Sequence, residues 1–326
     1  MLKSFMPDVI YGCEMTHDRL ASRKIVLKVI QDHCSVAKTH KACRTSSMST
    51  RRESRYVRFA KLAYEIALET FEPYTHAKSK HVFTQPQLAS CVLVMFYLDL
   101  SYRDMEEWLL ASSEVVSTLR LKRIPDHTTL CRMFKRMTMA KIRSMVSLIL
   151  ARLKPSEIVI ALDSTGFRAD QASAYYQLRC GQERKEWIKG AYAVGTESLL
   201  IVSAGQGVGR DGDSHFLRPL RQGAAQYAQP GWLLLADAGF DCIHTHSDDL
   251  IPPIRRHGKI VAPERKARAD LVAQARLEGV YGQRWMCETV HSVMKRLSGD
   301  SVRSRKTSLQ RREPVLKGLV YNLHVW

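Results

Sequence analysis

Long apolar runs and the apolar leader of a secreted protein are missing from this chain of 326 residues. The longest apolar stretch, residues 88–98, contains Ser90 and ends before Asp99, whereas a membrane-spanning helix needs about 18 or more apolar residues. The first ten residues include Pro7 and Asp8, where a signal peptide needs an unbroken apolar segment. The sequence therefore predicts a cytoplasmic, nucleoid-associated protein with no membrane partner.

Paired cysteines are missing as well. The 8 cysteines are scattered and form no C-x-x-C pair, so neither a disulfide framework nor a thioredoxin-like motif is indicated. His33, Cys34, His40 and Cys43 form one local cluster, but their spacing matches no zinc-finger pattern. Incidental residues in an N-terminal arm are the preferred interpretation, with a zinc site as the alternative.

Acidic residues are few relative to basic ones. The chain carries 50 Lys and Arg against 32 Asp and Glu, a formal net charge of +18. A hydrophobic fraction of 45% is ordinary for a globular protein, so global disorder is not expected. A strongly basic globular chain favours a polyanionic partner, nucleic acid above all.

Three regions follow one another along the chain. Residues 1–55 are polar and basic and predict a poorly ordered arm with at most a short helix near residues 22–30. Residues 56–154 show helical periodicity, with a capping box opening at Ser101 and an N-cap at Asp126. Short helices carrying basic residues are typical of a helix-turn-helix DNA-binding or accessory domain, and a helical bundle with a solvated basic face is the equal alternative.

The third region, residues 155–326, has the pattern of a mixed α/β domain. We expect three meandering strands in residues 156–209, a helix capped by Asp213, and a fourth strand near residues 230–237. Because the fourth strand is apolar, we expect it to be central and buried on both faces. A helix near residues 243–249, strands within residues 251–263 and a helical remainder from about residue 267 complete the prediction.

Two acids end two of these strands, and a third lies on a late helix. Asp163 and Asp237 follow apolar runs, at the strand ends where α/β sheets place their sites; turn-forming residues are the alternative for each. At 100° per residue, Glu288 shares one helix face with the cations and aromatic groups Tyr281, Arg284, His291 and Lys295. Met286, Val290, Val293 and Leu297 form the opposite, expected core face. The alternative is a solvated face with ordinary ion pairs.

Together, Asp163, Asp237 and Glu288 can supply a hard, oxygen-only metal site. Mg²⁺ takes one or two protein carboxylates and fills its other positions with water and phosphate oxygens. Two such ions about 3.5–4 Å apart stabilise the attacking and leaving oxygens of a phosphodiester. The pattern therefore favours two Mg²⁺ ions, for which Mn²⁺ substitutes, acting on a nucleic acid.

These residues also carry a family resemblance. The spacing of Tyr281, Arg284, Glu288 and Lys295 resembles the Tyr-Arg-Glu-Lys signature of bacterial and archaeal insertion-sequence DDE transposases. The blocks IVIALDSTGF and LLLADAGFD are similar to the segments that hold the first two acids of that family. The resemblance covers residues 155–326, and only about fifty residues separate the second acid from the third, which matches the compact subgroup without a large insertion.

The resemblance implies a ribonuclease-H-like mixed sheet with flanking helices, preceded by an N-terminal helical domain. Asp163, Asp237 and Glu288 would be the catalytic, metal-binding acids. The partners implied are double-stranded DNA, namely the terminal inverted repeats and the target, and a second copy of the chain in a dimer on paired ends. The implied DNA contacts are Tyr281, Arg284 and Lys295, and the basic segment after them adds Arg296, Arg303, Arg305 and Lys306.

Other polar and aromatic residues near these blocks are expected to have mainly structural roles. Asp213 is expected to be a helix cap, Asp241 to lie beyond the metals, and His291 to be a phosphate contact or a surface residue. Lys189 is expected on the strand surface and Trp187 in the core. Two other functions stay open, a metal-dependent DNA nuclease of the same fold and a non-catalytic, transposase-derived DNA-binding protein.

Overall fold

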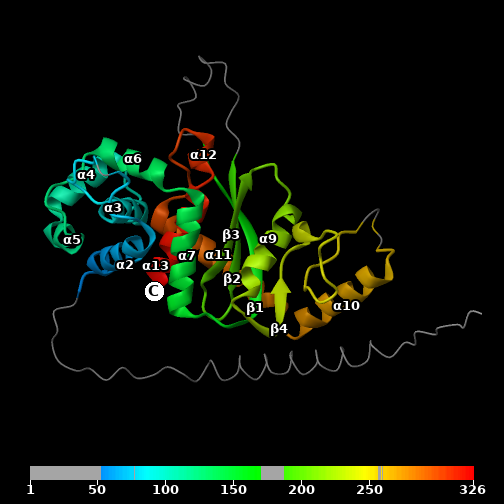
Figure 1. Cartoon of the computed structure of the whole chain (residues 1–326). Helices are drawn as coiled ribbons and strands as arrows, with labels where there is room; N and C mark the ends of the chain where they lie inside the picture. The colour runs from blue at the N-terminus through cyan, green and yellow to red at the C-terminus, as the bar shows by residue number, and fades with distance from the viewer. Residues whose placement is uncertain (1–52, 77, 170–186, 256–257, 259) are drawn as a thin grey trace, which may run out of the picture.

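A computed structural model describes residues 53–76, 78–169, 187–255, 258 and 260–326 (Figure 1). The expected N-terminal arm, the helix near residues 22–30 and the zinc alternative lie outside these residues, apart from residues 53–55. None of the helices in the described ranges is long and apolar enough to cross a membrane.

The first part of the described chain is helical. Its helices pack around one core, because apolar positions recur at helical spacing along each of them. Helix α3 is buried along almost its whole length, so its apolar run forms the centre of this bundle and not a membrane segment. The helices are α2 (Arg55–Thr70), α3 (Gln85–Tyr97), α4 (Tyr102–Ala111), α5 (Ser113–Thr118), α6 (His127–Arg136) and α7 (Met139–Leu153).

Capping residues fix where these helices begin. Thr84 and Ser101 form capping boxes at the starts of α3 and α4. The carboxylate of Asp126 accepts from the backbone N–H groups of Thr128 and Thr129 at the start of α6. Each cap satisfies backbone donors that the first helical turn leaves without partners. The two caps predicted at Ser101 and Asp126 are confirmed.

A four-stranded mixed sheet forms the second part of the fold. Strands β1 (Glu157–Phe167), β2 (Ile188–Gly195) and β3 (Ile201–Val208) run antiparallel, while β4 (Ala228–Leu235) lies parallel to β1. The order across the sheet is β3-β2-β1-β4. A turn at residues 196–198 joins β2 to β3, as the sequence predicts. A mixed sheet with flanking helices agrees with the fold class that was expected.

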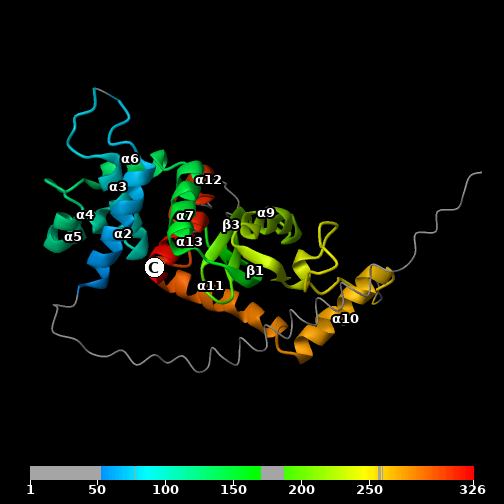
Figure 2. The same cartoon turned by 60° about the horizontal axis from the view of Figure 1, so that its bottom comes forward.

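Helices cover both faces of this sheet (Figures 1 and 2). On one face, Ile160, Leu162 and Leu234 pack with α9 (Ser214–Ala225). On the other, the alternate residues Ala161 and Leu235 pack with α11 (Trp285–Ser298). The period of two along each strand divides the apolar side chains between these two layers.

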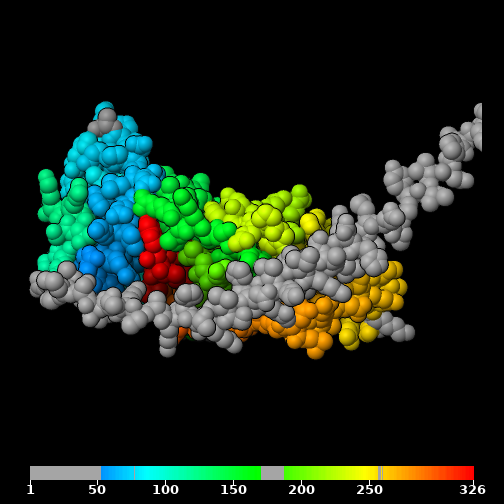
Figure 3. Space-filling model, turned by 90° about the horizontal axis from the view of Figure 1, so that it is seen from below, coloured from blue at the N-terminus to red at the C-terminus, as the bar shows by residue number. Residues whose placement is uncertain are grey.

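The C-terminal helix joins the sheet to the helical bundle. Helix α13 (Glu313–Val325) follows α10 (Pro263–Leu277), α11 and the short α12 (Thr307–Gln310). Leu316 and Leu319 belong to the core of the first helices, whereas Tyr321 belongs to the core beneath α11. Figure 3 shows this red segment between the blue N-terminal helices and the green strands. The division at residues 154 and 155 stays a prediction, since α13 packs with both parts.

Three expectations about the sheet region are wrong. Strand β4 is an edge strand of the four-stranded sheet, and its apolar end is buried because helices and a single parallel bridge from Leu235 to Leu250 cover it. Residues 243–249 form turns, held by side chains instead of by a helical ladder. The described residues within 251–262 form no strand, because their backbone groups bond to Asp241, Arg265 and Arg268.

Candidate active site

The parallel pairing of β1 with β4 brings two acids to one edge of the sheet. Ala161 pairs with Leu235, and Asp163 and Asp237 each follow two residues later on their own segments. Parallel neighbours lie about 4.8 Å apart, and residues two positions apart share a face. Both acids therefore continue the face on which Ala161 and Leu235 pack against α11.

A tight turn and a tyrosine hold the second acid. Asp237 accepts a hydrogen bond of 2.9 Å from the backbone N–H of Gly239, which opens the short 3₁₀ helix η1 (Ala238–Phe240). The hydroxyl of Tyr281 donates to the carbonyl of Ala236 at 3.0 Å. Tyr281 begins the 3₁₀ helix η2 (Tyr281–Arg284) that leads into α11, so the third acid's helix is anchored directly beside the second acid.

Arg284 connects the first acid to the third. Its guanidinium lies 3.9 Å from the Asp163 carboxylate and donates to Glu288 at 2.9 Å. The thiol of Cys287 donates to the carbonyl of Ala161 at 3.3 Å, which fixes α11 against β1. The structure thus brings the three acids to one region around Arg284, but the Glu288 side chain, 60% exposed, is bound to Arg284 and does not join Asp163 and Asp237.

Burial dominates the electrostatics of the first acid. The pKa of Asp163 is raised from 3.8 to about 6, chiefly by burial, and the negative charges of Asp237 and Glu288 act in the same direction. The N–H of Ser164 and the guanidinium of Arg284 act in the opposite direction. Burial beside other carboxylates destabilises the ionised form of a carboxyl group. Such a site therefore favours the binding of a cation.

His291 lies beneath the acids and not at the surface. It is 7% exposed, its Nδ1 lies 3.7 Å from Asp163, and its Nε2 has no hydrogen-bond partner among the described residues. Burial, together with the nearby Lys295 charge, lowers its pKa to about 4. The expectation of a surface histidine is therefore wrong, because α11 turns this residue towards Tyr192 of the sheet.

The buried face of α11 also differs from the expected one. The residues that pack most deeply are Cys287, Val290 and Met294, whereas Met286 and Val293 are only partly buried. The segment was treated as one helix, but residues 281–284 form a 3₁₀ turn and α11 starts at Trp285. The 3₁₀ turn changes how Tyr281 and Arg284 are placed relative to α11, and the buried face within α11 is the one that carries Cys287, which lies against Ala161 of β1.

A fourth carboxylate approaches the same edge from the opposite layer. Asp213 occupies the N-cap position of α9, but its side chain makes no cap bond. It accepts instead from the Ser164 hydroxyl at 2.6 Å and from the Lys189 ammonium at 3.1 Å. A Cβ placed on Gly239 would lie 3.1 Å from oxygens of both Asp213 and Asp237, so these oxygens are at most twice that distance, 6.2 Å, apart.

This arrangement corrects three sequence expectations. Asp213 does not act as a side-chain cap, Lys189 is largely covered and ion-paired, and Trp187 is 53% exposed and not part of the core. An acid at a helix start is ordinarily a cap, so no sequence signal distinguished Asp213. Arg265 and Arg268 bind the Asp241 carboxylate, and its position beyond the metals stays a prediction.

The predicted DNA contacts are divided between the site and the scaffold. Lys295 lies over the Phe167 ring at 5.5 Å, where burial lowers its pKa. Arg303 is ion-paired with Asp99, and its backbone N–H donates to buried Glu313 at 2.8 Å. The side chains of the remaining predicted contacts in this segment, Arg296, Arg305 and Lys306, are exposed.

The three acids have the chemistry of a divalent-cation site but are not assembled into one. Within the ranges that the structure describes, no group of three or more His, Cys, Asp or Glu residues is arranged to hold a metal ion. Arg284 occupies the space between Asp163 and Glu288. The donors are all carboxylate oxygens, the ligands that hard cations such as Mg²⁺ prefer.

Comparison with known proteins gives one match. A family model described as a transposase DDE domain matches residues 154–323, more than half of the chain. Searches of curated proteins and of solved structures found no match. The matched region contains β1, β4 and α11, and with them every acid of the candidate site. The chain belongs to the family of transposases that carry a DDE domain.

Proposed function

We propose that this protein is the DNA transposase of an insertion sequence and that Asp163, Asp237 and Glu288 are its catalytic acids. The observation that carries the proposal is the convergence of these acids on one sheet edge. Strand pairing places the first two at one level, and Arg284 connects the first to the third. The spacing of Tyr281, Arg284, Glu288 and Lys295 supports membership of the Tyr-Arg-Glu-Lys subgroup.

The sheet supports a ribonuclease-H-like assignment. Three antiparallel strands and a fourth strand parallel to the first agree with the order that the resemblance implies. Between β4 and α11 the described residues hold turns and α10 but no β-rich insertion. The compact subgroup remains the better match for this reason.

The carboxylates fit divalent cations in chemistry and charge. Asp163, Asp237 and Glu288 would hold two Mg²⁺ ions, or Mn²⁺ in their place, and bound ions would supply Lewis-acid stabilisation at a phosphodiester. The raised pKa of Asp163 reflects burial first and the nearby carboxylates second, and a bound cation would stabilise the ionised form of this acid. Glu288 must leave Arg284 to join the other acids, and its exposed side chain is free to turn.

Arg284 would then bind DNA. Once released from Glu288, its planar guanidinium can engage a phosphate through two hydrogen bonds. Lys295, Arg296, Arg305 and Lys306 would extend this contact, whereas Arg303 is held by Asp99 and would act through the position of its segment. We assign Tyr281 to positioning, since its hydroxyl bonds to Ala236.

The chain's own part in the reaction is to place and orient DNA at the acids. Water would cut the strand at the end of the element, and the freed 3′-hydroxyl would attack the target, with both element ends held by a dimer. No side chain needs to form a covalent bond to DNA. Positioning of this kind can account for a large share of the barrier, about 7–11 kcal/mol in favourable cases.

A plasmid-cleavage assay tests this proposal. The full chain is incubated with a plasmid carrying its own gene and the flanking sequence, in Mg²⁺, Mn²⁺ or EDTA. We expect metal-dependent breaks at fixed flanking positions, lost in Glu288→Ala and retained in Glu264→Ala, which removes an exposed glutamate from α10.

Other outcomes lead to the alternatives. Metal-dependent nicks at random positions would indicate a nuclease of the same fold. Intact DNA binding without any cleavage would contradict the catalytic assignment and favour a transposase-derived binding protein.

A further inference from the structure

An open hollow of about 450 Å³ lies on α9, on the side of the sheet away from α11. Four of its lining residues come from one face of α9, at spacings of three and four. The other four come from the loop at residues 243–246, directly after the segment that carries Asp237. The polar residues that line it are Arg218, Arg221, Gln222, His244, Thr245 and His246.

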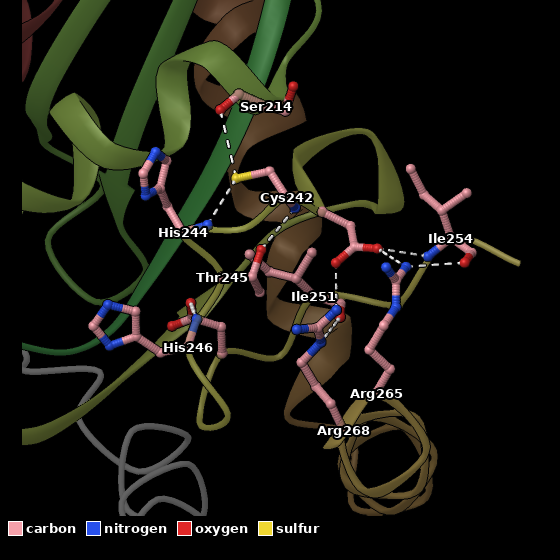
Figure 4. Close-up of polar contacts among 11 residues, drawn as sticks. Ser214, Cys242, His244, Thr245, His246, Ile251, Ile254, Arg265 and Arg268 are labelled. Atoms are coloured by element: carbon pink, nitrogen blue, oxygen red, sulfur yellow. Dashed lines mark hydrogen bonds and ion pairs between the residues drawn. The ribbon is translucent and has the colours of Figure 1, made fainter. Parts of the chain in front are cut away.

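The loop is attached to α9 at both of its ends, and Figure 4 shows the attachment through Cys242. The Cys242 thiol donates to the carbonyl of Ser214, the first residue of α9, at 3.9 Å. At the other end, buried Asp249 binds Arg221 and accepts from the backbone N–H of His246 at 2.7 Å. Thr245 also accepts from the N–H of Cys242 at 2.9 Å. The hollow therefore exists before any ligand arrives, so binding need not order the loop.

The lining residues are cationic or neutral. Arg218 is exposed, and its side chain makes no ion pair or hydrogen bond within the described part of the chain. His244 and His246 are exposed, and Figure 4 shows both rings pointing away from Arg265 and Arg268. No carboxylate lines the hollow. Ala225 and Ile243 make part of the lining apolar, and the donors of Arg218, His244 and His246 around this open depression are suited to a phosphate.

The hollow lies close to the candidate catalytic edge. Helix α9 starts beside Asp213, whose carboxylate is within 6.2 Å of Asp237, twice the 3.1 Å that separates each from a Cβ on Gly239. Arg218 and Arg221 follow Ser214 by four and seven residues, or roughly 6–11 Å along the helix. Measured along a duplex axis, where one strand carries a phosphate about every 3.4 Å, this length corresponds to two or three nucleotides.

We propose that this hollow binds a backbone phosphate of the DNA strand, two or three nucleotides from the bond that the acids cut. The inference rests on the proposed function, because it takes the position of the bond from the acids. Arg218 would supply the charge-assisted hydrogen bonds, with His244 and His246 as further donors. The strand would then be held on both sides of the catalytic edge, at α11 by Arg284 and at α9 by this hollow.

Salt-dependent binding of the full chain in EDTA tests the inference. The probe is a duplex from the flanking sequence of its own gene, centred on the cleavage position where one is found. We expect Arg218→Ala to weaken binding about tenfold and to lower the slope of log K against log salt by roughly 1. The double variant in which His244 and His246 are both replaced by Ala should also weaken binding. Arg143→Ala, which removes an exposed arginine from α7, is the matched control.

A scan with neutral methylphosphonates locates the phosphate. One substitution, two or three nucleotides from the cut, should weaken the wild type and Arg143→Ala but leave Arg218→Ala unaffected. The inference is overturned if Arg218→Ala has the same salt slope as the wild type, or if all three proteins respond equally to the methylphosphonate at every position. Cleavage by the wild type would leave the proposed function intact in that case. If Arg218→Ala lowers the salt slope of binding but the wild type does not cleave, the result supports phosphate binding in the hollow and rejects the catalytic proposal. If Arg218→Ala changes the oligomeric state but not the salt slope of DNA binding, the hollow is a contact between copies of the chain, and the inference is wrong.

Discussion

Replacing Asp163 by Asn should stabilise the metal-free protein at neutral pH and abolish cleavage. The folded carboxyl holds its proton more tightly than the unfolded one, because burial raises its pKa from 3.8 to about 6. This contribution to stability is complete below about pH 4 and is lost as the pH rises through 6. A pKa change of about 2 corresponds to about 3 kcal/mol. An amide never ionises, so Asp163→Asn keeps this free energy at pH 8.

Urea unfolding of both proteins in EDTA at pH 4, 6 and 8 measures the effect. The variant should be more stable by about 3 kcal/mol at pH 8 and nearly equal to the wild type at pH 4. His291 contributes a pH dependence of opposite sign and lies 3.7 Å from Asp163, so the same comparison in the background of His291→Asn isolates Asp163. The control Asp270→Asn, at an exposed position of α10, should change stability by less than about 0.5 kcal/mol throughout. A difference that is the same at all three pH values, or a variant less stable at pH 8, would refute the argument.

Three further changes test the surroundings of the acids. His291→Asn should remove a loss of stability of about 3 kcal/mol that the wild type shows as pH falls from 6.5 towards 4; parallel unfolding curves would contradict the buried, neutral imidazole. Tyr281→Phe deletes the hydrogen bond to the Ala236 carbonyl and should lower the free energy of unfolding by about 1 kcal/mol in urea, so an unchanged midpoint argues against that bond. Gly239→Ala places a methyl group 3.1 Å from two carboxylate oxygens and should reduce cleavage roughly tenfold or more with little change in melting temperature. Unchanged cleavage by Gly239→Ala would show that the reaction tolerates a displacement of Asp213 from Asp237.

Local signals predicted much of the fold. β1 and the hairpin that follows it were predicted from alternating and apolar runs joined by a turn. The helix starts at Ser101 and Asp126 were predicted from capping chemistry, which depends only on neighbouring residues. Asp163 and Asp237 were singled out for the same reason, since each directly ends an apolar run.

Tertiary contacts explain the errors. The edge position of β4 depends on which strands pair, and its apolar end is buried by helices that composition does not identify. The burial of His291 depends on which face of α11 packs on the sheet, where its ring lies beside Tyr192. Asp213 resembles an ordinary cap in sequence and meets Ser164 and Lys189 only after β1, β2 and α9 have assembled.

The placement of α13 has a consequence for synthesis on the ribosome. Leu316 and Leu319 complete the core of the first helices, Tyr321 completes the core beneath α11, and Asn322 bonds to both backbone groups of Ile201. Domains of growing chains often fold in order from the N-terminus. Here neither core closes until the segment at residues 313–325 has emerged, so the acids of the candidate site are not held in place before that segment has packed.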